Sequence, residues 1–179
     1  MEQTRQKDPS VAVLLLKLIF FLALISGTVL VWFPLFILFP AVRHSPVVWN
    51  AASITGAILI DIGAAVVLWC GLAFAIIGKG TPAIIEPPRV LVARGLYRYV
   101  RNPMYLAVFA ILAGESLLFW SAHLAGYAVV VVIGFNLFVR LYEEPNLKKR
   151  IGPAYVEYCR SVPRWIPRPP CSEHGEGSV

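Results

Sequence analysis

Four long apolar segments separated by polar stretches dominate the pattern of this chain of 179 residues. They cover residues 11–39, 51–77, 104–120 and 122–141. A helix needs about 20 apolar residues to cross the hydrocarbon core of a bilayer, so each segment is predicted to span a membrane, the third being short. Only the region of Ser121 separates the third segment from the fourth. These two are therefore predicted to form a helical hairpin.

The polar sequence after the fourth segment predicts one further helix. Pro145 suits the first turn of a helix. Apolar and aromatic side chains then recur at steps of three and four residues between 146 and 160, at Leu147, Ile151, Ala154, Tyr155 and Tyr158. This is typical of an amphipathic helix lying along a membrane surface or over a site, with a kink expected at Gly152. Residues 169–179, rich in Pro, Gly and Ser, are expected to be a disordered tail.

The composition supports a membrane protein. Hydrophobic residues make up 58% of the chain and charged residues 15%, against roughly half and a quarter in soluble domains. The predicted fold is all-α: a polytopic transmembrane helical bundle of about four spans, forming a single membrane domain over residues 1–179. The three cysteines show no paired spacing, so neither a disulfide framework nor a metal site is predicted.

The distribution of positive charge predicts the topology. The net charge is +6, and the basic residues flank the apolar segments rather than forming the stripe expected of a nucleic-acid binder. They concentrate before the first segment, between the second and third, and after the fourth, while the loop after the first holds only Arg43. Basic loops stay cytosolic, so both termini and the polar stretches are predicted to be cytosolic, in a bacterial inner membrane or the endoplasmic reticulum.

Two polar stretches at the cytosolic edge hold the candidate chemistry. Asn136, Arg140 and Glu144 stand at steps of four and would share one helix face, which is predicted to turn inward because polar groups are costly against lipid. Arg94, Arg98, Arg101 and Tyr105 would also share a face if their segment is helical. A plainer interpretation also fits, in which the arginines anchor the membrane edge and the glutamates cap a helix. The site hypothesis requires the two stretches to converge.

Two carboxylates fall inside predicted spans, at Asp61 and Glu115. Such residues are functional candidates, although pairing between helices or protonation would explain them equally well. The chain contains no glycine-rich dinucleotide fingerprint, P-loop, HExxH or G-x-S-x-G motif.

The order of several short motifs adds a resemblance. These are residues 95–105 (GLYRYVRNPMY), a short hairpin, Glu143-Glu144-Pro145, Gly152 with Tyr155 and Tyr158, and residues 162–167 (VPRWIP). Together they resemble the isoprenylcysteine carboxyl methyltransferase family, which is related to the membrane phospholipid methyltransferases. The resemblance covers about residues 80–168, the expected catalytic core.

The resemblance implies an S-adenosylmethionine-dependent methyltransferase that acts in the membrane on a lipophilic acceptor, either an isoprenylcysteine carboxylate-like or a phospholipid-like molecule. It implies catalytic roles for Arg101 and Arg140, and a substrate face formed by Arg140 with Asn136. The residues that would bind the cofactor are Arg89, Val90, Leu91, Val92, Tyr97, Asn102, Pro103, Met104, Tyr105 and Glu144. Asn102 stands where this family usually has His; it can form hydrogen bonds but cannot carry charge.

Two other function classes are compatible with the pattern. A sterol-type membrane reductase has a similar polytopic design and would bind a nicotinamide cofactor. A non-catalytic transport or scaffold bundle would use Asp61 and Glu115 as an ion path. Binding of a methyl donor separates the first hypothesis from both.

Overall fold

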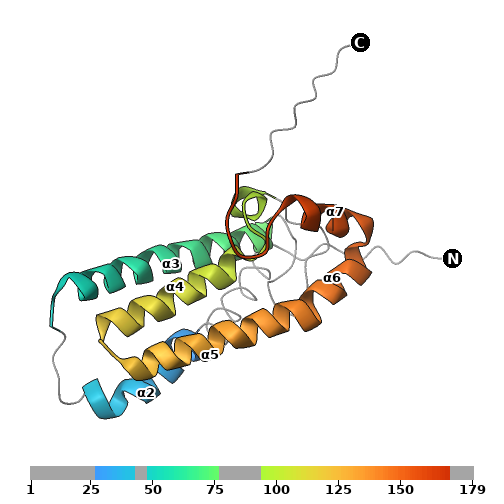
Figure 1. The fold of residues 1–179 in the computed structure, drawn as a ribbon. Coiled ribbons are helices and arrows are strands. Elements are labelled where there is room, and N and C mark those ends of the chain that lie inside the picture. Colours follow the sequence, from blue (N-terminus) through green and yellow to red (C-terminus); the bar gives the residue numbers. More distant parts are fainter. Residues whose placement is uncertain (1–26, 43–47, 77–93, 170–179) are drawn as a thin grey trace.

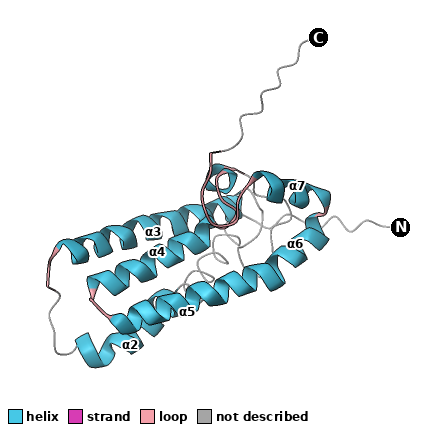
Figure 2. Cartoon of the chain, in the orientation of Figure 1, coloured by secondary structure: helices cyan, strands magenta, loops and turns pink. Residues whose placement is uncertain are grey.

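The computed structural model describes residues 27–42, 48–76 and 94–169, and these ranges contain helices but no strand (Figures 1 and 2). The described elements are, in order, the π-helical turn η2 (Thr28–Trp32), α2 (Phe33–Val42), α3 (Ala51–Ile76), the 3₁₀ turn η3 (Gly95–Arg98), α4 (Pro103–Leu118), α5 (Ala122–Phe138), the π-helical turn η4 (Val139–Glu143), α6 (Glu144–Ile151) and α7 (Pro153–Ser161). The all-α prediction is therefore confirmed for the described ranges.

Helices α3 and α4 form the tightest pair, because glycines let their backbones touch. A Cβ atom on Gly56 would lie 2.5 Å from the carbonyl oxygen of Gly114, and one on Gly63 would lie 2.8 Å from that of Ala107. The earlier residue of α3, Gly56, meets the later residue of α4, Gly114, and the later Gly63 meets the earlier Ala107. The two helices therefore run antiparallel. The apolar core lies along this seam and consists of Val67, Ala107, Val108, Ile111 and Leu112.

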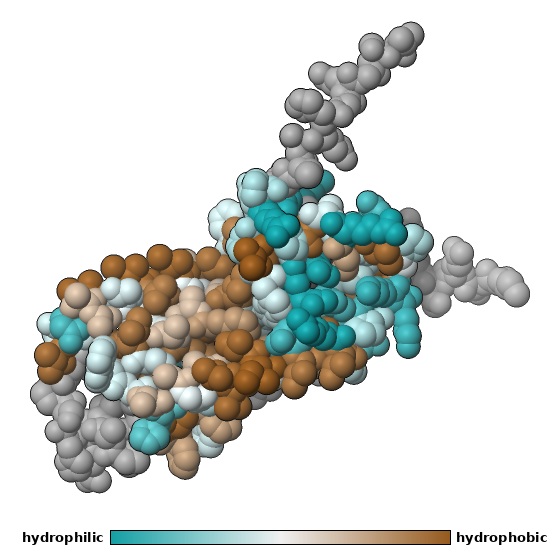
Figure 3. Space-filling model, in the orientation of Figure 1, coloured by the Kyte–Doolittle hydropathy of each residue, from teal (hydrophilic) through white to brown (hydrophobic). Residues whose placement is uncertain are grey.

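The predicted hairpin of the third and fourth segments is confirmed. Pro103 occupies the first turn of α4, and α5 begins directly after Ser121, whose side chain accepts a hydrogen bond from the backbone N–H of Leu124 at 3.4 Å. The outer face of α5 exposes large apolar side chains, among them Val130, Ile133 and Leu137. Figure 3 shows apolar residues covering the long part of the molecule and polar ones gathering at one end.

Among the described residues, two helical runs are long and apolar enough to cross a membrane, Ala51–Ala73 and Ala122–Ile151. Pro103–Leu118 is apolar but shorter. Of the first predicted segment, residues 11–26 lie outside the described residues, as do residues 170–179 of the predicted tail.

Pro145 lies in the first turn of α6, as predicted, but α6 does not stand apart from α5. The helical run continues from α5 into α6 through η4, where the backbone N–H of Glu144 bonds to the oxygen of Val139, five residues back. A proline ring clashes with the carbonyl four residues earlier, and the wider π turn relieves that clash. The extra residue in this turn also changes which side chains share a face. Arg140 is exposed rather than turned inward, so that part of the prediction was wrong.

The amphipathic segment after α5 is two helices rather than one kinked helix. Gly152, with φ 73° and ψ −140°, ends α6 and precedes α7. This backbone conformation is essentially restricted to glycine, so the chain turns sharply here. Leu147 and Ile151 of α6 then pack against Tyr155 and Tyr158 of α7.

The arginine-rich stretch before α4 is not one continuous helix either, so its expected common face does not form. Gly95 has φ 60°, η3 ends at Arg98, and Asn102 has φ −123° before α4 begins. Arg94 and Arg98 are exposed, whereas Arg101 and Tyr105 are partly buried. These backbone breaks separate two surface arginines from two residues that reach the interior.

Candidate functional site

A segment after α7, Val162–Arg168, ties the site together; we call it the strap. The backbone N–H of Arg101 donates to the oxygen of Pro163 at 2.9 Å, and that of Arg168 donates to the oxygen of Tyr99 at 3.0 Å. The side-chain amide of Asn102 donates to the carbonyl oxygen of Arg164 at 3.2 Å. The strap therefore lies against the polar stretch that leads into α4.

Glu144 is the electrostatic centre of the site. Its carboxylate accepts hydrogen bonds from Arg101 Nη1 at 2.9 Å, and from Nε and Nη2 of Arg164, both at 2.7 Å. The Glu144 side chain is only 7% exposed. A buried carboxylate needs such compensation, and the fork geometry of Arg164 is the strongest form of it. Three distant parts of the chain meet at this one group.

The two arginines around Glu144 differ in what they leave unpaired. The hydrogen bond to Glu144 raises the pKa of the Arg164 guanidinium. Both Nε and Nη2 of Arg164 donate to the Glu144 carboxylate. Arg101 also donates from Nη1 to Cys159 Sγ at 3.0 Å, but its Nε is buried and has no hydrogen-bond partner among the described residues. Such an orphaned N–H is costly unless another acceptor reaches it.

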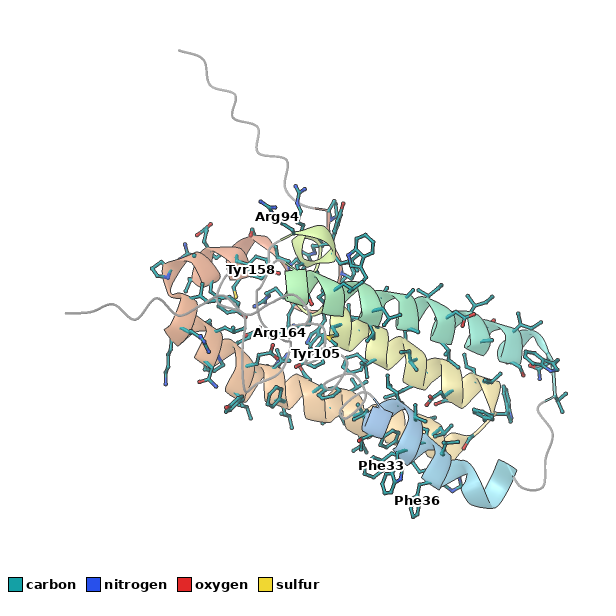
Figure 4. All side chains as sticks on the ribbon, turned by 180° about the vertical axis from the view of Figure 1, so that it is seen from behind. Phe33, Phe36, Arg94, Tyr105, Tyr158 and Arg164 are labelled. Atoms are coloured by element: carbon teal, nitrogen blue, oxygen red, sulfur yellow. The ribbon has the colours of Figure 1, made fainter. Side chains whose placement is uncertain are left out.

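Glu143 points to a different partner from its neighbour. Its Oε2 accepts a hydrogen bond from the Tyr105 hydroxyl at 2.9 Å. The Tyr105 ring packs on Phe135, with centroids 4.9 Å apart, and Phe109 lies 6.2 Å from Phe135 and 5.7 Å from Trp165. We call these four rings the aromatic wall. Figure 4 shows Tyr105 and Arg164 from behind, between the α3–α4 pair and the α5–α6 run.

Buried tyrosines hold α7 in place behind the site. The Tyr158 hydroxyl donates to the backbone oxygen of Tyr97 at 2.7 Å, and Tyr158 packs with Tyr155 and Val162. Burial raises the pKa of the Tyr158 hydroxyl, which therefore stays a neutral donor at physiological pH. This contact joins η3 to α7 and positions Arg101 between them.

The predicted convergence of the two polar stretches is confirmed by the contacts of Arg101 with Glu144 and of Tyr105 with Glu143. Asn136 joins them, because its Oδ1 accepts a hydrogen bond from Trp165 Nε1 at 3.2 Å. Asn102 and Pro103 are buried at the start of α4. Tyr97 is buried, and Met104 packs against it.

Other predicted residues stand apart. Arg140 is exposed, and Arg89, Val90, Leu91 and Val92 lie outside the described residues. Asp61 is exposed on α3. Glu115 is partly buried near the far end of α4, and its Oε2 has no hydrogen-bond partner within the described ranges. Neither of these two carboxylates touches the Glu144 cluster.

Sequence reasoning missed three contributors to this site, Arg164, Trp165 and Cys159. The VPRWIP motif was noted, but only as part of a resemblance, and no periodicity assigns its arginine to Glu144. A usable signal was the predicted inward position of Glu144, since a buried carboxylate needs cation partners and Arg164 lies in the basic stretch that follows. Within the described residues no group of three or more His, Cys, Asp or Glu side chains forms a metal-binding cluster.

Comparison with known protein families adds one finding. The family model described as phospholipid methyltransferase matches residues 51–154, which run from α3 to α7 and contain Arg101, Tyr105 and both glutamates. Searches of curated proteins and of solved structures gave no match. Because the match covers more than half of the sequence, this chain belongs to the phospholipid methyltransferase family.

Proposed function

We propose that the protein is an S-adenosylmethionine-dependent methyltransferase that modifies a lipophilic acceptor at the cytosolic surface of a membrane. Membership of the family supports methyl transfer to a lipid. The observation that carries the proposal is the meeting of Arg101 and Tyr105 with Glu144 and Glu143, which gathers charged groups beside apolar helices. The catalytic core proposed for this activity is residues 80–168.

The residues around Glu144 fit the charges of the cofactor. Arg101 offers a carboxylate its buried Nε–H, which has no hydrogen-bond partner in the described part of the chain. Glu144 Oε2 accepts one hydrogen bond from Arg164 Nη2, and a carboxylate oxygen can accept a second from an ammonium or hydroxyl group. The aromatic wall suits a positive sulfonium, because ring faces attract cations. We assign cofactor contacts to Arg89–Val92, Tyr97, Asn102–Tyr105 and Glu144.

When bound, S-adenosylmethionine supplies a methyl group already activated on a positive sulfur. The protein then has to hold that methyl group in line with the acceptor and exclude water. Positioning of this kind contributes roughly 7–11 kcal/mol to lowering a barrier. The strap supports it by accepting a backbone hydrogen bond from Arg101 at Pro163 and by holding, through Arg164, the Glu144 carboxylate that the Arg101 side chain contacts.

The acceptor is proposed to reach the site from the lipid, with Arg140 and Asn136 facing it. Arg140 is exposed four residues before Glu144, where its planar guanidinium can hold a carboxylate or a phosphate. This covers both acceptor types considered, a prenylated carboxylate and a phospholipid headgroup.

We expect Arg140→Ala to raise the KM for an anionic lipid acceptor about 10-fold or more, because a hydrogen bond to a charged group contributes roughly 1.5–3 kcal/mol. The Kd for S-adenosylmethionine, measured by calorimetry, should change less than threefold. Lys149→Ala is the matched control, since Lys149 is another exposed cation on the same helical run. Equal loss of acceptor use and cofactor affinity would contradict the assigned role.

The function itself is tested on the purified wild-type protein. Calorimetric titrations with S-adenosylmethionine and with NADPH distinguish a methyl donor from the nicotinamide cofactor of a reductase. Incubation with methyl-labelled S-adenosylmethionine and a total membrane extract, followed by identification of the labelled product, then names the acceptor. Absence of both donor binding and labelled lipid would overturn the proposal.

A further inference from the structure

Two adjacent carboxylates in the site have opposite surroundings. Glu144 is neutralised by two guanidinium groups. Glu143 forms no ion pair with any described residue and accepts one hydrogen bond, from the neutral Tyr105 hydroxyl. Neighbouring acidic groups held in such different environments are the usual arrangement when one is structural and the other exchanges protons. The contrast therefore assigns a structural role to Glu144 and leaves Glu143 as the candidate for proton exchange.

Glu143 also retains capacity to act on a ligand. A carboxylate has about four acceptor positions, and the Tyr105 hydroxyl fills one of them. Because the Tyr105 ring packs on Phe135, this carboxylate stands at the edge of the aromatic wall. Negative charge beside ring faces attracts a cationic or proton-bearing group and repels an anion.

We propose that Glu143 is the general base that removes a proton from the nucleophile of the methyl acceptor. This inference rests on the proposed methyl transfer. A carboxylate nucleophile would need no such base, whereas an amine or a thiol does. The inference therefore assigns the acceptor a nucleophile that carries a proton.

The step balances as follows for an amine. The carboxylate of Glu143 takes one proton from the R–NH₃⁺ group, which leaves a lone pair on nitrogen. That lone pair forms a bond to the sulfonium methyl carbon as the carbon–sulfur bond breaks. The electron pair of the broken bond stays on sulfur, which becomes a neutral thioether. The product is R–NH₂⁺–CH₃, and Glu143 returns its proton to water.

The other described titratable groups around Glu143 are not suited to accept a proton from the nucleophile. They are Tyr105 of α4, Tyr97 of η3 and Glu144 of α6. Phenols ordinarily titrate near pH 10, and Glu144 is held by Arg101 and Arg164. Of these described groups, Glu143 is left as the carboxylate that neither guanidinium holds.

The test is single-turnover methyl transfer from S-adenosylmethionine to phosphatidylethanolamine in mixed micelles, with N-acetyl-S-farnesylcysteine as a carboxylate probe. We expect Glu143→Gln to slow transfer to the amine about 100-fold or more, the usual contribution of a positioned base. The Kd for S-adenosylmethionine should stay within threefold of wild type. Glu157→Gln is the matched control, because Glu157 is 73% exposed and its ion pair within the described ranges is with the exposed Arg160. Its rate should match wild type.

Tyr105→Phe provides a second readout that does not depend on the folding of Glu143→Gln. Loss of the donated hydrogen bond destabilises the carboxylate and raises its pKa, so the rising limb of the pH–rate profile should move to higher pH. The assignment of a base would be overturned if the limb did not move in Tyr105→Phe, or if Glu143→Gln transferred methyl groups at the wild-type rate. It would also be overturned if Glu143→Gln lost cofactor affinity as much as rate, or if the wild-type protein methylated only the carboxylate probe. A wild-type protein that binds no donor and methylates neither probe would instead overturn the proposed function.

Discussion

At the scale of single residues, the site depends on how a buried negative charge is compensated. Glu144 is held by one bond from Arg101 and two from Arg164, which come from positions 43 residues before it and 20 residues after it. Removing one partner of a buried pair leaves the other charge unpaired, and that cost exceeds what the pair itself contributes. Stability and site geometry are therefore coupled through one carboxylate.

We expect Arg164→Ala to lower the free energy of unfolding in detergent micelles by about 3 kcal/mol, the low end for breaking a buried ion pair because Arg164 is 27% exposed. Arg160→Ala is the control. Its pair with Glu157 is 75% and 73% exposed, and such surface pairs contribute about 0–1 kcal/mol. Equal effects of the two substitutions in chemical denaturation would show that Glu144 does not depend on Arg164.

The sequence predicted which polar stretches meet, but it did not predict the exposure of a residue that depends on local backbone geometry. The pairing of residues near 101–105 with residues 143–144 followed from two polar stretches flanking apolar segments, and the contacts confirm it. The exposure of Arg140 did not follow, because it depends on the extra residue in η4 beside Pro145. Spacing rules assume 3.6 residues per turn and cannot anticipate that insertion.

At the scale of elements, the position of the site depends on the close packing of α3 and α4. Gly56 and Gly114 face one another, and each lies against the backbone of the opposite helix. Small residues that allow backbones to touch are a common means of association in membranes, where hydrophobic burial does not drive helices together. The position of the start of α4, with Asn102 as its N-cap and Tyr105 in its first turn, is set by this seam.

We expect Gly56→Ala to destabilise the protein by about 1–3 kcal/mol, because the added methyl would lie 2.5 Å from a backbone oxygen that cannot rotate away. Gly134→Ala on α5 is the matched control. A Cβ there meets nothing within 4 Å, and replacing a helical glycine by alanine adds roughly 0.5–1 kcal/mol of stability. Thermal melts in detergent distinguish the two, and a tolerated Gly56→Ala would contradict the packing.

The existence of the helices was predictable, but their boundaries and joints were less so. Hydropathy and the caps at Ser121 and Pro103 located α4 and α5 within a few residues. The helix break at Gly152 was anticipated only as a kink, because sequence does not show that the residue takes φ 73°. Periodicity also predicted a common helix face for Arg94, Arg98, Arg101 and Tyr105. That face does not form, because the segment contains the 3₁₀ turn η3 instead of a continuous helix.

At the scale of the whole molecule, the structure is an apolar body with one polar end (Figure 3). The start of α4, the end of the α5–α6 run and the strap all lie at that end (Figure 1). The hairpin turn around Ser121 lies at the opposite end of α4 and α5. Combined with the positive-inside bias, this supports the proposed four-span topology with both termini and the site in the cytosol.

Labelling with a membrane-impermeant maleimide tests that topology in a chain whose own cysteines are replaced by alanine. We expect His123→Cys, an exposed position after the hairpin turn, to react from the non-cytosolic side of sealed cells or vesicles. Ser161→Cys, an exposed position at the end of α7, should react only after permeabilisation. Reaction of both from one side would contradict the single crossing expected between them. The reverse pattern would contradict the assigned orientation of the site.

The late position of Arg164 in the chain has a consequence for biosynthesis. Helices α3 to α6 precede it, so a ribosome completes them, and the carboxylate of Glu144, before the second guanidinium exists. During that interval Arg101 can bond to it and Lys148 lies near it, but the two-point contact of Arg164 is missing. The cluster around Glu144 is therefore completed only when the strap has been translated, after every described helix of the chain.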